Sequence, residues 1–259
     1  MKIAILGAGA FGTALGGILA NNGYDIDYYD SRVERERLSD VVSDAKMILI
    51  AVPSMALPYL IPYLPKNKPL IIATKGILSD NPFKDFPDYM MISGPGFADD
   101  IKAHKKTRLT ITDKRIEEMF KQDYLIFDYT DDEKGVLMCG ALKNVYAIYA
   151  GIKGLKRDSS ELKKYIKEAS NEMRLVLEAN AAEGATVDCY CGIPDLILTC
   201  GYPSRNYEYG DLWRKNHNYK AEKTVEGISA LKRISRGEII VPDEAILLKE
   251  LLDLSKSFA

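Results

Sequence analysis

Three glycines near the start of the chain restrict its fold more than any other feature. The short apolar run Lys2–Leu6 is typical of a buried strand, and Gly7, Gly9 and Gly12 follow it directly. In this spacing the first glycine permits a tight turn, the second lets a phosphate group approach the backbone, and the third lets a helix pack on the strand. The pattern therefore predicts a strand, a turn and a helix over residues 13–22 whose N-terminus can bind phosphate.

Apolar runs alternate with helical stretches through the first half of the chain. This alternation predicts an α/β fold with an N-terminal Rossmann-type, doubly wound sheet over residues 1–130. Residues 131–259 are predicted to form an all-helical domain. There, Asp158 and Glu161 resemble a capping box that starts a long helix. Further strands are expected at 26–30, 47–52, 69–74, 89–93, 108–112 and 125–129, and further helices at 160–182, 225–234 and 243–255.

The composition excludes several classes of function. Of the 259 residues 28% are charged and the net charge is -2, so no basic face for nucleic acid is expected. Residues 47–65 are apolar over a membrane-spanning length, but four prolines interrupt them, so we expect no membrane insertion. The chain has four cysteines and two histidines, and their spacing does not match that of a zinc site, so we expect no metal. We expect a cytoplasmic protein with free thiols. The sequence leaves open whether the protein forms a homodimer.

The pair Lys143-Asn144 interrupts a stretch that is otherwise apolar on every side. A helix that is apolar all round is usually buried, and a lysine buried there needs a partner and a task. The alternative is a lysine that snorkels from the helix to water. Asp195, at the head of another apolar run, is a plausible partner for Lys143, although an acid in such a place is often only a helix cap. We interpret Lys143 as a candidate catalytic residue.

The end of the second expected strand bears on cofactor choice. Asp30 lies where a carboxylate binds the ribose hydroxyls of a dinucleotide, which favours NAD over NADP. Arg32 follows two residues later and could accept the 2′-phosphate of NADP, so NADP stays possible.

Two other polar segments are candidates for a small anionic ligand. Lys75 lies just past an expected strand end, where ligands bind in open α/β sheets, although a surface turn would also explain it. Ser204, Arg205 and Asn206 offer a hydroxyl, a guanidinium and an amide in one turn, which suits a phosphate or a carboxylate. By itself that turn is a weak signal.

Taken in order along the chain, these motifs resemble one family. The chain is similar to NAD(P)-dependent sn-glycerol-3-phosphate dehydrogenases, from its first residues to its last helix. Their helical domain resembles that of 6-phosphogluconate dehydrogenase. The motifs that carry the resemblance are Gly7 to Gly12, Ala51-Val-Pro-Ser54, Thr74-Lys-Gly76, Ser93-Gly-Pro95, Gly140 to Asn144, Asp195 to Cys200, Ser204 to Asn206 and Val225-Glu-Gly227.

The resemblance implies a reaction and a set of roles. It implies the interconversion of dihydroxyacetone phosphate and sn-glycerol 3-phosphate, feeding phospholipid synthesis, with Lys143 as the acid/base and Asp195 beside it in the catalytic pair. The implied phosphorylated substrate would be bound by Lys75, Gly94, Lys143, Asp195, Ser204, Arg205 and Asn206. The implied NAD, or NADP, would be bound by Gly7, Gly9, Ala10, Phe11, Gly12, Asp30, Ser31, Lys75, Ala98, Arg205 and Glu226.

The chain departs from the family pattern in three places. It is shorter than is usual, mostly between residues 31 and 44. Gly96 stands where a hydroxyl residue is usual, and the segment from Thr199 to Ser204 is one residue short. The change at Gly96 motivates an alternative, a reductase of another small phosphorylated or carboxylated keto compound. The shortened connection motivates another, a non-catalytic protein that binds NADH.

Overall fold

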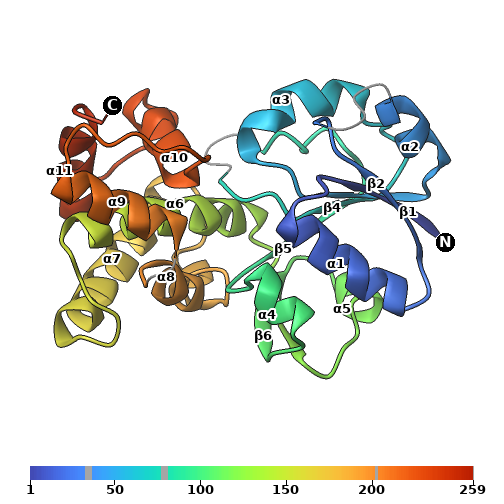
Figure 1. The fold of residues 1–259 in the computed structure, drawn as a ribbon, viewed down its shortest axis with the longest axis horizontal. Helices are drawn as coiled ribbons and strands as arrows, with labels where there is room; N and C mark the ends of the chain where they lie inside the picture. Colours follow the sequence, from blue (N-terminus) through green and yellow to red (C-terminus); the bar gives the residue numbers. More distant parts are fainter. Residues whose placement is uncertain (33–36, 77–80, 202–203, 259) are drawn as a thin grey trace. The chain divides into compact units, whose positions relative to one another are not determined.

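The computed structural model of the protein describes residues 1–32, 37–76, 81–201 and 204–258 (Figure 1). Their contacts divide the chain into two compact units. The first unit consists of Met1–Thr74 and Asn81–Asp131, and the second consists of Lys75–Asp80 and Asp132–Ala259. A short piece of the N-terminal half, which includes Lys75, therefore belongs with the C-terminal half.

The first unit contains a seven-stranded sheet in the order β2-β1-β3-β4-β5-β6-β7. The first five strands in that order are parallel, as the doubly wound pattern predicts. β6 runs antiparallel to β5 because the chain continues beyond the end of β5 and then turns back. The sequence pattern did not predict this reversal. The strands are β1 (Lys2–Leu6), β2 (Asp25–Tyr29), β3 (Met47–Ile50), β4 (Leu70–Ile72), β5 (Tyr89–Ser93), β6 (Thr107–Ile111) and β7 (Leu125–Tyr129).

Helices cover both faces of this sheet (Figure 1). α1, α4 and α5 lie on one face, and α2 and α3 lie on the other. The first face buries a continuous apolar cluster that includes Ile5, Leu15, Leu49, Ile101 and Phe120. The helices are α1 (Ala10–Asn21), α2 (Leu38–Asp44), α3 (Leu57–Leu60), α4 (Ala98–Lys102) and α5 (Arg115–Met119), with short 3₁₀ turns at Ser54–Ala56 and Ile61–Tyr63.

The second unit is built around one buried helix, α6 (Glu133–Ile152), in which residues 135–151 are all buried. The other helices pack around it (Figure 1). Every regular element described in this unit is helical, in agreement with the predicted helical domain. The others are α7 (Ser160–Ala179), the 3₁₀ segment Gly184–Asp188, α8 (Ile193–Thr199), α9 (Arg205–Lys215), α10 (Glu226–Ser235) and α11 (Ile246–Ser255).

The start of α7 differs from the predicted capping box. Ser159, not Asp158, is the N-cap, and its hydroxyl accepts a hydrogen bond from the backbone N–H of Leu162 at 3.0 Å. Asp158 lies in the left-handed region with φ 64°, so its backbone cannot serve as the extended N-cap residue. The helix was therefore predicted with the correct first residue, but its N-cap is one residue later than the capping box implied and it ends at Ala179 instead of residue 182.

Two segments have the length and apolarity of a membrane span. Residues 47–65 form β3, the short helix α3 and two 3₁₀ turns, so the expected strand is present and no single long helix forms there. Within the described residues, one helix, Glu133–Ile152, is long and apolar enough to cross a membrane. However, 94% of its most apolar window is buried inside the structure, so it is the core helix of the second unit.

Candidate active site in the helical unit and dinucleotide turn in the sheet unit

Lys143 lies at the middle of α6 and does not snorkel to water. Only 4% of its surface is exposed, and its Nζ donates a hydrogen bond to Oδ2 of Asp195, which is 1% exposed. Asp195 is in the first turn of α8, where the N-terminal end of the helix favours a negative charge. Lys75 Nζ lies 3.7 Å from the same carboxylate oxygen. The structure thus brings together Lys75, Lys143 and Asp195, three of the predicted substrate residues.

The surroundings of Lys143 adjust its protonation. Burial lowers the pKa of Lys143 from about 10.5 to about 8, and the nearby positive charge of Lys75 acts in the same direction. The carboxylate of Asp195 opposes the shift but does not cancel it. An amine whose pKa lies near neutral pH can both give and take a proton, which is the requirement for general acid–base catalysis.

Thr199 completes this group and was not singled out from the sequence. Its hydroxyl donates a hydrogen bond to the backbone carbonyl of Asp195 at 2.6 Å and lies 3.4 Å from the Asp195 Oδ1. The signal was present, because residues four apart on a helix lie on the same face. Thr199 holds the last turn of α8 against the carboxylate that pairs with Lys143.

Asn144 also received no role from the sequence, although an amide in an apolar helix was a signal for one. Its Oδ1 accepts a hydrogen bond from Asn206 Nδ2 at 2.8 Å. Asn206 Oδ1 in turn accepts from the backbone N–H of Gly227 at 2.9 Å. Adjacent residues of α6 therefore contact different helices, Lys143 meeting α8 and Asn144 meeting α9.

The predicted anion-binding turn forms the start of α9. Ser204 is its N-cap and is buried, and Asn206 is buried behind it. Arg205 is exposed, and its Nη1 donates a weak hydrogen bond to the Thr224 carbonyl at 3.4 Å. Glu226 is the first residue of α10 and lies two residues after Thr224.

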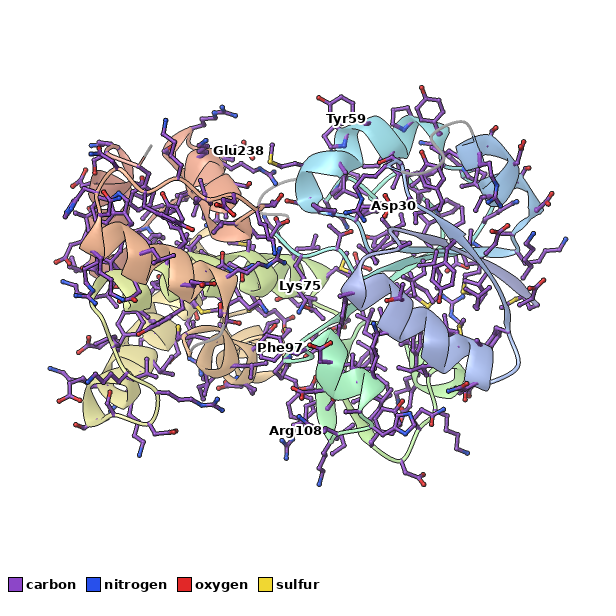
Figure 2. The ribbon with its side chains drawn as sticks, in the orientation of Figure 1. Asp30, Tyr59, Lys75, Phe97, Arg108 and Glu238 are labelled. Atoms are coloured by element: carbon purple, nitrogen blue, oxygen red, sulfur yellow. The ribbon has the colours of Figure 1, made fainter. Side chains whose placement is uncertain are left out.

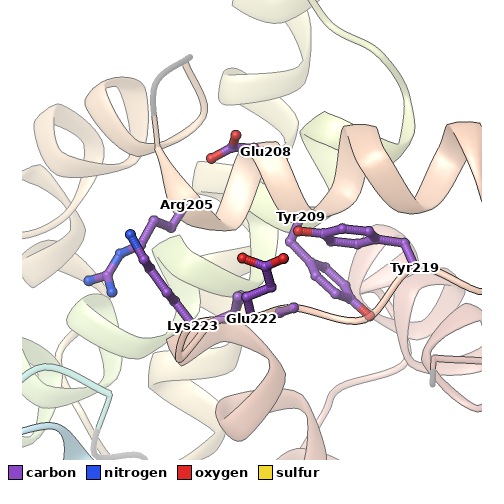
Figure 3. Close-up of a pocket in the computed structure, with 8 residues that line it drawn as sticks. Arg205, Glu208, Tyr209, Tyr219, Glu222 and Lys223 are labelled. Atoms are coloured by element: carbon purple, nitrogen blue, oxygen red, sulfur yellow. The ribbon is translucent and has the colours of Figure 1, made fainter.

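A pocket opens between the start of α9 and residues 219–225 (Figure 3). The side chains of Arg205 and Lys223 lie at one side of the pocket and two tyrosine rings at the other. Arg205 and Lys223 bring two positive charges to the lining of this pocket, and Glu208 and Glu222 bring two negative charges. The lining residues are Arg205, Glu208, Tyr209, Tyr219, Ala221, Glu222, Lys223 and Val225.

In the sheet unit, the glycine-rich turn has the geometry that a dinucleotide needs. Gly7 has φ 111°, and a Cβ there would lie 2.7 Å from the Ala51 carbonyl oxygen. A Cβ on Gly12 would lie 2.0 Å from the Gly7 carbonyl, whereas a Cβ on Gly9 would meet nothing within 4 Å. The first and third glycines thus permit close packing, and the second faces open space.

The N-terminus of α1 is also suited to an anion. Gly9 is its N-cap, no side chain caps the first turn, and no acidic residue lies there. Ala10 and Phe11 begin the helix, at the end where the helix dipole is positive. The turn therefore fits the pyrophosphate of NAD or NADP, which residues 7–12 would hold.

Asp30 directly follows β2 and is flanked by Ser31 (Figure 2). Arg32 donates to both of its carboxylate oxygens, at 2.8 Å from Nε and 2.5 Å from Nη2. The hydrogen bonds from Arg32 hold the pKa of Asp30 below its usual range. The residue that favours NAD and the residue that could favour NADP are therefore bound to each other.

The remaining predicted positions of the sheet unit follow β5. Gly94 has φ 140°, and a Cβ there would lie 3.0 Å from the Arg108 carbonyl. Gly96, where the family usually has a hydroxyl residue, would place a Cβ 3.3 Å from the Thr107 methyl group. Ala98 is the first residue of α4. The shortened connection after residue 31 and the segment from Thr199 to Ser204 lie partly outside the described residues.

Comparisons with known proteins agree with these features. Residues 132–239 match the family described as NAD-dependent glycerol-3-phosphate dehydrogenase C-terminus. Glycerol-3-phosphate dehydrogenase (NAD(P)+) of Leptospira biflexa is 31% identical over 287 residues, covering 92% of this chain and 85% of that protein.

Solved structures give the same result over the full length. Glycerol-3-phosphate dehydrogenase from Coxiella burnetii has a TM-score of 0.79 and 25% identity, covering 99% of this chain and 97% of that one. The enzyme of Plasmodium falciparum has a TM-score of 0.78 and 18% identity over 100% of this chain and 91% of that one, and so shares the fold. From the identity with the Leptospira protein, this chain belongs to the NAD(P)-dependent glycerol-3-phosphate dehydrogenase family.

Proposed function

We propose that the protein is a glycerol-3-phosphate dehydrogenase that interconverts dihydroxyacetone phosphate and sn-glycerol 3-phosphate with NAD(P)H. In this role it would supply glycerophospholipid synthesis. Relatives with this name align over most of the chain. The charged residues that we assign to the reaction are Lys75, Lys143, Asp195 and Arg205. Residues 1–130 would bind the dinucleotide, and residues 131–259 would bind the substrate and catalyse.

The observation that carries the proposal is the buried pair of Lys143 and Asp195. Bound NAD(P)H would supply the hydride, so the chain itself must bind the substrate, orient it and move one proton. The Lys143 ammonium gives that proton to the oxygen on C2 as the ketone becomes an alcohol, and the neutral amine takes it back in reverse. Asp195 keeps the Nζ in place, and a pKa of about 8 makes both protonation states accessible.

Substrate binding is assigned to residues with complementary chemistry. Arg205, Ser204 and Asn206 hold the phosphate, because a guanidinium and neutral donors on one turn match its oxygens. Lys75 and Gly94 complete the substrate contacts, with Lys75 also near the cofactor. Cofactor contacts are assigned to Gly7, Gly9, Ala10, Phe11, Gly12, Asp30, Ser31, Lys75, Ala98, Arg205 and Glu226.

We place the protein in the cytoplasm and expect NAD as the preferred cofactor. Four free cysteines, three of them buried, suit a reducing compartment, and the apolar helix α6 is buried in the core. The molar mass in solution would decide whether the homodimer that the sequence leaves open is formed.

A single spectrophotometric assay tests the reaction. Purified protein should oxidise NADH when dihydroxyacetone phosphate is added, and Lys143→Met should lower kcat by at least about 100-fold while NADH still binds. Lys153→Met is the matched control, because Lys153 is an exposed lysine at the C-terminal end of the same helix, and its kcat should stay within about twofold.

The alternatives give different results in the same assay. Turnover of another phosphorylated or carboxylated keto compound, but not of dihydroxyacetone phosphate, would contradict the proposed substrate. NADH binding without turnover of any such compound would indicate a sensor. If Lys143→Met retains kcat within a few-fold, Lys143 does not handle the proton and Lys75 becomes the next candidate.

A further inference from the structure

The side chain of Asn144 links three helices of the second unit. It projects from α6, receives a hydrogen bond from Asn206 of α9, and Asn206 receives one from the Gly227 N–H at the start of α10. Asn144 and Asn206 are 5% and 8% exposed, so both amides lie out of reach of bulk water. Buried hydrogen bonds of this kind fix orientation strongly because losing one leaves a polar group without a partner.

The direction of each hydrogen bond is set by the one before it. Asn144 Nδ2 donates to the Gly140 carbonyl of its own helix at 3.0 Å. This contact leaves the Asn144 Oδ1 as the group that faces Asn206, which must then present its Nδ2. The Oδ1 of Asn206 is left to accept from Gly227. Asn206 therefore has a single amide hydrogen remaining for a ligand.

The start of α10 rests directly on α6 at this point. A Cβ on Gly227 would lie 2.6 Å from the backbone oxygen of Asn144, so the two helices meet with no side chain between them. The residues just before α10 also contact α9, because Arg205 donates a hydrogen bond to the Thr224 carbonyl. The first turn of α9, with Arg205 and Asn206, and the first turn of α10, with Glu226, are thus hydrogen-bonded to each other.

We propose that Asn144 is a positioning residue that, through Asn206, holds the first turn of α10 and so couples the substrate-phosphate turn to the cofactor contact at Glu226. This inference rests on the proposed function, which assigns Asn206 to the substrate and Glu226 to the cofactor. Neither Asn144 nor Asn206 is assigned a contact with NADH. Any effect of their substitution on NADH affinity must therefore be indirect, through the first turns of α9 and α10 that carry Arg205 and Glu226.

The test measures the Kd for NADH by fluorescence titration of the whole protein. Asn144→Ala removes the link. Asn144→Ser keeps a hydroxyl that can bond the carbonyl four residues back in its own helix but is too short to reach Asn206. We expect each variant to raise the Kd for NADH about three- to tenfold. Asn206→Ala should raise it by a similar factor, and Asn144→Ala with Asn206→Ala together by no more than the larger single effect.

A matched control separates positioning from loss of stability. Asn180 also donates to the carbonyl four residues back, that of Val176, and its amide also bridges to another segment, at Ile240. Asn180→Ala should lower the Tm but leave the Kd for NADH unchanged. An unchanged Kd in both Asn144 variants, multiplying effects in the double variant, or an equal rise in Asn180→Ala would overturn the inference.

The turnover of dihydroxyacetone phosphate by the wild-type protein tests the proposed function separately from the role of Asn144. Absence of NADH oxidation with dihydroxyacetone phosphate, together with normal NADH binding, contradicts the substrate assignment. The Kd values of the variants still decide whether Asn144 positions the first turns of α9 and α10 for the cofactor.

Discussion

At the scale of the residue, Lys143 shows both the reach and the limit of the sequence. An apolar run on both sides was sufficient to predict that the lysine is buried, because a charge in such a helix is exceptional. Asp195 as its partner followed from the same reasoning, and the structure confirms the contact. The proximity of Lys75 to the same oxygen was not predicted, since it depends on a contact between distant segments.

The pKa of Lys143 leads to a pH dependence with a definite sign. The proton donor in ketone reduction is the ammonium form, so kcat/KM for reduction should be highest below pH 8 and fall as the pH rises through about 8. In alcohol oxidation the neutral amine is required, so that rate should rise over the same interval. Both profiles are measured as initial rates from pH 6 to 10.

Two substitutions should move this transition in opposite directions. Lys75→Met removes a positive charge that lowers the pKa of Lys143, so the transition should move to higher pH. Asp195→Asn removes the charge that raises the pKa, so the transition should move to lower pH. A transition that stays in place in both variants would show that another group controls it.

At the scale of the element, periodicity and composition were sufficient for most strands and helices. β1 and β5 start and end where their apolar runs do, because a strand buried on both faces is almost entirely apolar. The edge strand β7 also has the predicted bounds, although it is only partly buried. The N-cap of α7 was assigned one residue too early because Asp158 and Ser159 can both cap a helix, and only the backbone conformation distinguishes them. The reversal of β6 depends on the path of the chain beyond β5, which no local pattern encodes.

The packing of α6 against α9 depends on two glycines that the sequence did not reveal as partners. A Cβ on Gly151 would lie 2.1 Å from the Tyr207 carbonyl, and one on Gly210 would lie 2.0 Å from the Ile148 carbonyl. Each helix thus presents a glycine to the backbone of the other. This close approach places Asn144 and Asn206 within hydrogen-bond distance.

Gly210→Ala should therefore disturb both stability and the site. Overpacking of this kind costs about 1–3 kcal/mol of unfolding free energy. It should also displace the start of α9, so that KM for dihydroxyacetone phosphate rises. Chemical unfolding and steady-state kinetics measure the two effects.

Gly17→Ala is the control for Gly210→Ala, because it also replaces a helical glycine with alanine. A Cβ there would meet nothing within 4 Å, so alanine should stabilise α1 by about 0.5–1 kcal/mol through its helix preference. Equal effects of the two substitutions would mean that the contact between α6 and α9 is not close-packed in solution.

At the scale of the whole molecule, the succession of strands and then helices predicted both architectures. Those features follow from hydrophobic pattern, which each local segment carries by itself. Cofactor choice does not, because it depends on the balance between two side chains. Asp30 and Arg32 form an ion pair in the structure, with 12% of the Asp30 side chain and 77% of the Arg32 side chain exposed. The ribose hydroxyls of NAD must compete with Arg32 for the carboxylate, whereas a 2′-phosphate would draw Arg32 away from it.

Ligand-induced stabilisation of the whole chain tests this balance. NADH at 100 times its Kd should stabilise the folded state by about 2.7 kcal/mol, which for a chain of this size raises the Tm by roughly 5–10 °C. In Asp30→Ala the shift with NADH should shrink at the same concentration, while the shift with NADPH should hold or grow because Arg32 is released. Asp25→Ala, at the opposite end of β2, is the matched control and should keep the wild-type shifts. A larger shift with NADPH than with NADH in the wild-type protein would reverse the predicted preference and assign the dominant contact to Arg32.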